Sequence, residues 1–133
     1  MLQQQLSVFL QNKAGRAAEI CRTIGEAGVN IVGFDIADTP EGYGIFRVLV
    51  DDPQTALDIL HTHGITVTKN DVVVIKLGHT PGTLGKLLSI IANEGLNIDY
   101  MYAGADNTLV FHFDKNEHAI RVLTDGGYTV VKQ

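Results

Sequence analysis

The sequence has few of the residues that build disulfides, cysteine-rich zinc sites or nucleic-acid surfaces. Cys21 is the sole cysteine among 133 residues, which excludes an internal disulfide framework and a cysteine-rich zinc site. The formal net charge is −5 and the chain has no block of Lys and Arg, which argues against a nucleic-acid surface. We therefore expect no bound metal, no cofactor and no nucleic-acid partner.

Long apolar runs are also missing. No stretch approaches the roughly 18 apolar residues that suggest a membrane-spanning helix. The N-terminus lacks the basic region followed by an apolar one that is typical of a secretory leader. The Gly-x-Gly-x-x-Gly pattern of dinucleotide sites does not occur either. We expect a soluble cytoplasmic protein without a membrane partner.

What the sequence does contain is a repeat. Residues 6–31 align without a gap to residues 73–98, at an offset of 67. The identical pairs are Leu10/Leu77, Gly15/Gly82, Ile24/Ile91, Gly28/Gly95, Asn30/Asn97 and Ile31/Ile98. These identities fall on turn, helix-end and core positions, where repeats keep their meaning. The chain is therefore predicted to be a tandem duplication, with one unit over residues 1–70 and a second over residues 71–133.

Each unit is predicted to run strand, helix, strand, strand, helix, strand. In the first unit the strands are 5–10, 30–37, 44–50 and 65–69, with a helix at 15–27 and another that begins at Pro53 and ends at Gly64. In the second unit the strands are 72–77, 97–103, one around 109–113, and 128–131, with a helix that has Pro81 in its first turn and another at 115–125. Residues 70–71 form the joint. The hairpin loop of the second unit is four residues shorter, so the offset falls to 63.

The apolar pattern shows which side of each element is buried. One continuous helical stripe consists of Ala17, Ile20, Cys21, Ile24 and Ala27. Cys21 is thereby expected to be a core thiol, and Phe46, Phe111 and Phe113 are expected to lie in the core, with His112 facing the other way. The βαββαβ order predicts an α+β, ferredoxin-like fold, in which two helices cover one face of a four-stranded antiparallel sheet.

The turn and strand motifs resemble those of one family. With Asn12-x-x-Gly15 and Gly28-Val29-Asn30-Ile31, the chain is similar to the ACT domain, a small-molecule-sensing module of amino-acid metabolism. The resemblance covers the whole chain as two tandem units. It departs from the family pattern at Ala14, where Pro is usual, at Ala17, where Leu is usual, and at His79, where an acidic or amide residue is usual.

The resemblance implies a set of ligand-binding residues. In ACT pairs the effector lies between neighbouring units, and amides at the positions of Asn12 and Asn30 grip it. A glycine turn lets backbone N–H groups and a helix N-terminus approach an α-carboxylate. We expect the strand-start asparagines on the same end of the unit as the turn. The predicted ligand-binding residues are Asn12, Ala14, Gly15, Asn30, His79, Gly82 and Asn97.

Plainer roles remain open for these residues. Asn12 could serve only to form a turn, and Asn30 and Asn97 could cap backbone groups at the helix–strand corner. Lys13 and Arg16 flank the first turn, as solvated charges or as groups that assist a carboxylate. Because the two hairpin loops differ in length, the two sites need not be equivalent, and we favour the first unit for the ligand.

The resemblance implies a stand-alone regulatory protein that binds a small effector, an amino acid. A homodimer and a regulated enzyme partner are further expectations. One alternative is a structural or protein-interaction module without a ligand, and another is a small enzyme on the ferredoxin-like scaffold. The sequence suggests no nucleophile with its base and no acid–base pair of carboxylates, so we predict no catalytic residues.

Overall fold

The computed structural model describes residues 1–11 and 13–133, so the predicted ligand residue Asn12 lies outside the described residues. The chain forms two compact units. The N-terminal unit consists of Gln4–Asn70, and the C-terminal unit consists of Asp71–Gln133 together with Met1–Gln3. The elements follow two βαββαβ repeats, with the last strand of the second repeat reduced to a single bridge, which confirms the α+β fold class.

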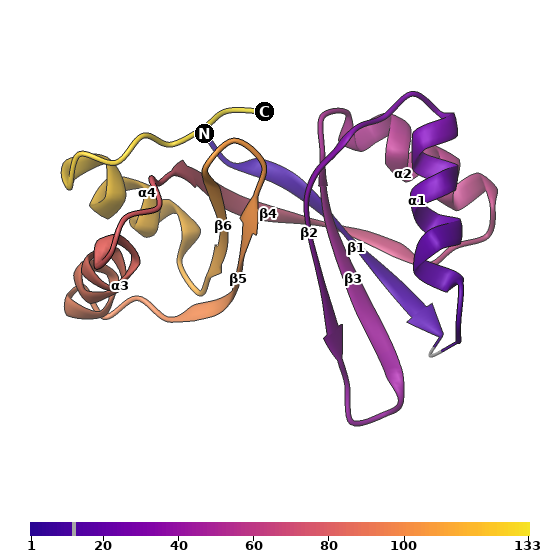
Figure 1. Ribbon diagram of the computed structural model, residues 1–133, viewed down its shortest axis with the longest axis horizontal. Helices are drawn as coiled ribbons and strands as arrows, with labels where there is room; N and C mark the ends of the chain where they lie inside the picture. Colours follow the sequence, from indigo (N-terminus) through magenta and orange to yellow (C-terminus); the bar gives the residue numbers. More distant parts are fainter. Residues whose placement is uncertain (12) are drawn as a thin grey trace. The chain divides into compact units, whose positions relative to one another are not determined.

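The N-terminal unit contains the first three strands, the first two helices and the start of the fourth strand (Figure 1). Its elements are β1 (Gln3–Gln11), α1 (Arg16–Glu26), β2 (Ile31–Asp38), β3 (Tyr43–Val50), α2 (Pro53–Thr62) and the beginning of β4 (Val67–Lys76). Strand β3 lies between β1 and β2. The chain enters β4 beside β1, where the amide of Phe9 donates to the carbonyl oxygen of Thr66 at 3.1 Å.

The directions of the strands put the end of β1 and the start of β2 at opposite ends of this unit. Both β1 and β2 pair antiparallel to β3, so β1 and β2 run in the same direction. Gln11, the last residue of β1, pairs with Tyr43, and Ile31, the first residue of β2, pairs with Val50. The end of β1 and the start of β2 are therefore separated by nearly the full length of β3, about 24 Å at the usual rise per residue.

The core of the N-terminal unit lies between the sheet and its two helices. Figure 1 shows α1 and α2 on the same side of the strands. The inward residues of the strands are buried together with those of the helices, because alternate strand positions share a face with the helical stripe. This cluster includes Leu6, Val8, Phe46 and Val48 from the sheet and Ile20, Ile24, Ala56 and Leu60 from the helices.

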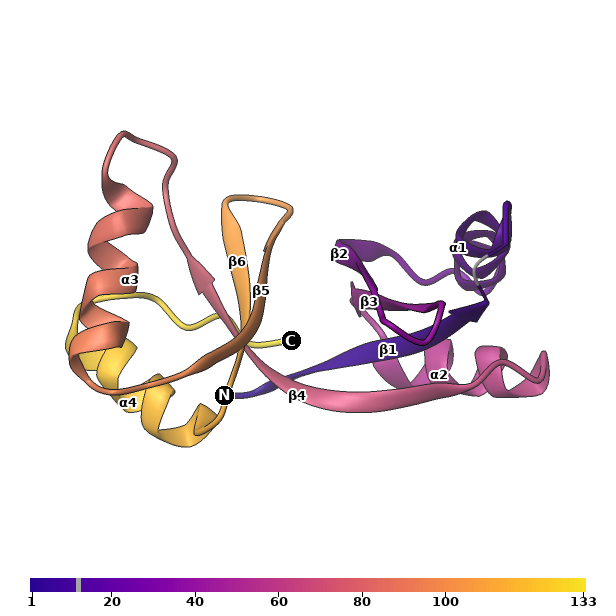
Figure 2. The ribbon, with the colours of Figure 1, turned by 90° about the horizontal axis from the view of Figure 1, so that it is seen from below.

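The C-terminal unit repeats this arrangement. Its elements are the end of β4, then α3 (Thr83–Asn93), β5 (Ile98–Gly104), β6 (Thr108–Phe113) and α4 (Asn116–Asp125). Strand β6 lies between β4 and β5, and α3 and α4 lie together on one side of these strands (Figure 2). Phe111 and Phe113 are buried in the core, as predicted, with ring centroids 5.1 Å apart. His112 stacks instead on Tyr100, its neighbour across the hairpin, on the opposite face.

Three details differ from the sequence predictions. The strands predicted at 65–69 and 72–77 form one unbroken strand, β4, which runs through the predicted joint at residues 70–71. Pro81 is not in the first turn of a helix; it lies in the turn before the cap residue Gly82. The strand predicted at 128–131 is reduced to a single bridge between Ile75 and Val130.

Candidate functional site

The glycines of the two repeated turns have the same backbone conformation. Gly15 and Gly82 precede α1 and α3, and both have a φ of 86°. This left-handed conformation strains a residue that carries a Cβ, so the turn role predicted for both glycines is confirmed. An added Cβ would meet no atom within 4 Å at either position. Ala14 and His79, also predicted to bind ligand, are exposed in the segments that lead into these turns.

The strand-start asparagines lie at the other end of their units. Each follows the C-terminal end of a helix, and Asn30 stands at the Val50 end of β3, about 24 Å from the Gly15 end. The expectation that Asn30 shares an end with the glycine turn was therefore wrong. The same topology separates Asn97 from Gly82 in the C-terminal unit. The helix explains the error, because its length carries the chain back across the unit before the next strand starts.

The backbone of each asparagine forms a closed pair with an aspartate. The Asn30 amide donates to Asp51 Oδ1 at 3.0 Å, and the Asp51 amide donates to the Asn30 carbonyl oxygen at 3.1 Å. Asn97 and Asp114 make the same two bonds, each at 3.1 Å. The backbone role left open for the asparagines is therefore present in both units. Their side chains are exposed, and the Asn97 amide group donates to Asp99 Oδ1 at 3.4 Å.

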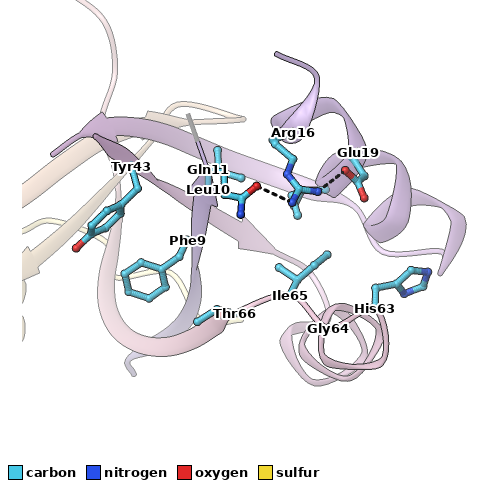
Figure 3. A pocket seen from close by; sticks show the side chains of 11 residues that line it. Phe9, Leu10, Gln11, Arg16, Glu19, Tyr43, His63, Gly64, Ile65 and Thr66 are labelled. Atoms are coloured by element: carbon cyan, nitrogen blue, oxygen red, sulfur yellow. Dashed lines mark hydrogen bonds and ion pairs between the residues drawn. The ribbon is translucent and has the colours of Figure 1, made fainter. Parts of the chain in front are cut away.

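A cavity of about 310 Å³ lies in the N-terminal unit, beside the Gly15 turn. Its wall comes from the end of β1, the first turns of α1, the start of β3 and the connection from α2 to β4 (Figure 3). This volume is at the small end of the range that protein sites for small molecules occupy. The cavity therefore suits a ligand of modest size.

The polar side of the cavity carries both signs of charge. Arg16 Nη1 lies 3.0 Å from Glu19 Oε2, and Arg16 Nη2 donates to Gln11 Oε1 at 3.1 Å. These three groups come from the end of β1 and the first turn of α1 (Figure 3). The side chains of Arg16 and Glu19 are 40% and 49% exposed, so both charges are accessible to a ligand.

The apolar side of the cavity contains an aromatic pair. The rings of Phe9 and Tyr43 have centroids 6.0 Å apart and planes inclined at 53°. Leu10, Ile20 and Ile65 also line the cavity. The site thus places a cation and an anion next to apolar and aromatic surface, as a ligand with a charged head and an apolar body requires.

The same backbone carries different side chains in the C-terminal unit. The bond from Phe9 to Thr66 recurs from the Lys76 amide to the Thr129 carbonyl oxygen at 3.0 Å. The hydrogen bond from the His63 amide to the Ile59 carbonyl oxygen also recurs, from the Gly126 amide to the Val122 carbonyl oxygen. In repeat order, Phe9, Gln11, Arg16, Glu19, Tyr43 and His63 correspond to Lys76, Gly78, Thr83, Lys86, Asp106 and Gly126. The cavity side chains are therefore particular to the N-terminal unit.

Phe9, Gln11, Glu19 and Tyr43 line the cavity but are not among the ligand-binding residues predicted from the sequence. Their closeness is not visible in the sequence, because Phe9 and Tyr43 meet only through the pairing of β1 with β3. Arg16 was noted as a group flanking the turn, and it does line the cavity.

Cys21 is partly buried in the N-terminal unit. Burial raises the pKa of the Cys21 thiol, which packs against the core of the N-terminal unit as predicted. Among residues 1–11 and 13–133, no three His, Cys, Asp or Glu side chains gather where they could hold a metal ion. None of the helices that the structure describes has the length and apolar character needed to cross a membrane.

Known proteins share this architecture. The protein BT0572 from Bacteroides thetaiotaomicron is 33% identical, with a TM-score of 0.90 over 98% of this chain and 92% of that chain. The regulatory subunit of aspartate kinase from Thermus thermophilus is 18% identical, with a TM-score of 0.67 over 92% of this chain and 90% of its own. The corresponding subunit from Thermus flavus is 19% identical, with a TM-score of 0.65 over 94% and 93%. At 18% and 19% identity, the likeness to these two subunits concerns the fold.

No functionally curated protein matches the chain. The model of the ACT domain pair matches residues 1–132. This match includes both glycine turns and both strand-start asparagines, the residues on which the resemblance rested. The chain therefore belongs to the ACT domain pair family.

Proposed function

We propose that this ACT domain pair is a regulatory protein that binds an amino acid in the cavity of its N-terminal unit. The observation that carries the proposal is the pairing of Arg16 with Glu19 on the wall of that cavity. An amino acid presents an anion and a cation on neighbouring atoms, and this pair offers the complement of both. The regulatory subunits with the same fold support a regulatory role by analogy alone.

Arg16 and the start of α1 favour the α-carboxylate. The guanidinium can bind a carboxylate through two N–H groups. The N-terminus of α1 adds a partial positive charge. Gly15, which precedes α1, has no Cβ that would hinder the close approach of a carboxylate to the backbone N–H groups. Glu19 accepts the ammonium group. An exposed ion pair three residues apart contributes only about 0.2–0.5 kcal/mol, so a ligand can replace it at small cost.

The remaining predicted residues stay predictions. Ala14 belongs to the turn beside the cavity, and His79, Gly82 and Asn97 belong to the C-terminal unit. Asn30 lies beside the Val50 end of β3, whereas the cavity lies at the Tyr43 end, so Asn30 cannot reach the cavity of its own unit. A homodimer and a regulated enzyme partner also remain part of the proposal. Light scattering of the purified protein, with and without the amino acid that stabilises it, tests whether it forms a homodimer.

Thermal unfolding in the presence of each of the twenty amino acids tests the proposal. A ligand at 100 times its Kd should add about 2.7 kcal/mol to the free energy of unfolding. Arg16→Thr, which introduces the residue found at position 83, should abolish the shift. Thr83→Ala and Lys86→Ala, at the equivalent positions of the C-terminal unit, should leave it unchanged.

Two results would contradict the proposal. If no amino acid stabilises the protein, a structural or interaction module without a ligand becomes the better description. If Arg16→Thr keeps the shift while Thr83→Ala removes it, the ligand belongs to the C-terminal unit. Asn30→Ala and Asn97→Ala in the same assay determine whether either amide contributes.

A further inference from the structure

Phe9 and Tyr43 expose aromatic surface at the cavity. Each residue is 39% exposed, and both line the same cavity as Arg16 and Glu19 (Figure 3). Adjacent exposed rings leave a continuous apolar surface in contact with water, and such surfaces commonly mark binding sites. A third ring can join a tilted pair of this kind at centroid distances of about 4.5–7 Å.

The fold does not require rings at these two positions. At the equivalent positions the C-terminal unit carries Lys76 and Asp106, and Lys76 Nζ donates to the Asp106 carbonyl oxygen at 2.7 Å. The backbone bond made by Phe9 is retained by Lys76, so the strand keeps its pairing with a charged residue in place of the aromatic one. Because the same frame forms with polar residues, a structural need does not account for the aromatic pair.

The rest of the wall leaves little that would pair with a charged effector side chain. Leu10, Ile20 and Ile65 are apolar, and Arg16 and Glu19 are assigned to the two charges of the amino-acid head. His63 is the remaining titratable residue of the wall besides Tyr43, and its Nδ1 lies 2.9 Å from the Ile59 carbonyl oxygen. Since a carbonyl oxygen only accepts, Nδ1 carries the proton and is directed to the backbone.

We infer that the effector is an amino acid with an aromatic side chain, whose ring packs against Phe9 and Tyr43. The inference rests on the proposed function, because it presumes that the head group binds at Arg16 and Glu19. It adds a side-chain class, and it makes the two rings the residues that determine specificity.

Titration calorimetry with the full chain measures this specificity. Phenylalanine, tyrosine and tryptophan are compared with leucine, lysine, aspartate and glycine. Phe9→Leu and Tyr43→Leu keep an apolar residue and remove one ring each, and each should weaken phenylalanine binding by roughly 2- to 12-fold while changing leucine binding little. Tyr43→Phe keeps the ring and should retain binding.

Phe34→Leu is the matched control, because it removes an exposed ring of the same unit that does not line the cavity. It should leave phenylalanine binding unchanged. The deaminated analogue 3-phenylpropanoate and the decarboxylated analogue phenethylamine should both bind more weakly than phenylalanine, since each lacks one charge of the head group. Unfolding curves without ligand verify that every variant is folded.

The possible failures are distinguishable. If leucine, lysine, aspartate or glycine binds best and Arg16→Thr abolishes that binding, the proposed function stands and the aromatic specificity is overturned. If aromatic amino acids bind but Phe9→Leu and Tyr43→Leu weaken them no more than Phe34→Leu does, the assigned ring contact is wrong. If no amino acid binds, the proposed function and this inference both fail.

Discussion

The two units of this protein share a backbone and differ in the side chains that could bind a ligand. The glycine turns have the same φ, and the asparagine–aspartate pairs recur bond for bond. Against this frame, the cavity residues of the N-terminal unit are replaced by lysine, glycine, threonine and aspartate in the C-terminal unit. The comparison teaches that turn, cap and core positions specify this fold, while the positions between them are free to carry function.

The hairpins show a second difference between the units. Strands β2 and β3 have eight residues each, whereas β5 has seven and β6 has six. The N-terminal hairpin turns with a glycine of positive φ, Gly42, and the C-terminal one turns with Asp106 and Asn107, both at a φ of 57°. The four residues missing from the second unit thus come from strands as well as from the loop. Tyr43 begins β3 directly after the longer loop, so the longer hairpin is also the one that supplies a wall of the cavity.

The largest expected effect tests what the units share. Ile24→Ala and Ile91→Ala truncate matching core residues that are fully buried in their helices. Each should lower the free energy of unfolding by about 2–5 kcal/mol, because lost burial and the remaining cavity both destabilise. Urea denaturation measures both. A near-neutral effect of one of the two would show that the cores are not equivalent.

The next largest effect concerns the glycine turns, which both units share, and the cavity side chains, which are particular to the N-terminal unit. Gly15→Ala and Gly82→Ala should each destabilise by about 1–2 kcal/mol through left-handed strain alone. Only Gly15→Ala should also weaken ligand binding in calorimetry. Gly25→Ala and Gly85→Ala, at helical positions with open space around them, should instead stabilise by about 0.5–1 kcal/mol. Equal weakening of binding by both turn variants would break the proposed asymmetry.

A smaller effect concerns the helix caps. Asp52 caps α2 by accepting the Thr55 amide at 3.2 Å, whereas the corresponding residue before α4 is Lys115, which makes no side-chain cap bond. Lys115→Asp should stabilise the protein by about 1 kcal/mol, since aspartate is a preferred cap residue. Lys115→Ala removes the charge without adding an acceptor and should not reproduce the gain. An equal gain in stability from both variants would show that the loss of the Lys115 charge, and not the new cap acceptor, causes the gain.

The smallest effect is the pH dependence of the Asp52 cap. Hydrogen bonds from the Thr55 hydroxyl and amide hold the pKa of the Asp52 carboxyl below its ordinary value. A carboxyl with a lowered folded-state pKa stabilises the fold above the ordinary aspartate range, and this contribution disappears as the pH falls through the folded-state pKa. Asp52→Ala should therefore melt below the parent protein at pH 7, with the gap closing in acid. A gap that is constant with pH would exclude this carboxylate as its source.

The local features of the fold were predictable from the sequence. Helical stripes, cap glycines and alternating strands each depend on neighbours within a few residues, and the two copies reinforce one another. The single strand β4 was missed because Asn70 and Asp71, which are poor strand formers, suggested a joint. In the structure β4 continues through these two residues, and the Asp71 carbonyl oxygen accepts from Asn116 Nδ2 at 2.9 Å.

The candidate site was predictable only in part. Gly15 and Arg16 follow from the turn motif, which is local. The aromatic wall depends on the register of β1 against β3, and that register is not visible from residue types. Asn30 was assigned to the wrong end because motif matching carries no strand direction, although a strand–helix–strand crossover makes the two strands parallel.

The three residues that begin the chain belong to the C-terminal unit. Leu2 packs against the core of that unit, and Gln3 Nε2 donates to the Val131 carbonyl oxygen at 3.0 Å. Strand β4 meanwhile contains the boundary between the units, with Val67–Asn70 on one side of it and Asp71–Lys76 on the other. No single cleavage therefore yields two intact modules: a fragment of residues 71–133 lacks Leu2 and begins inside a strand.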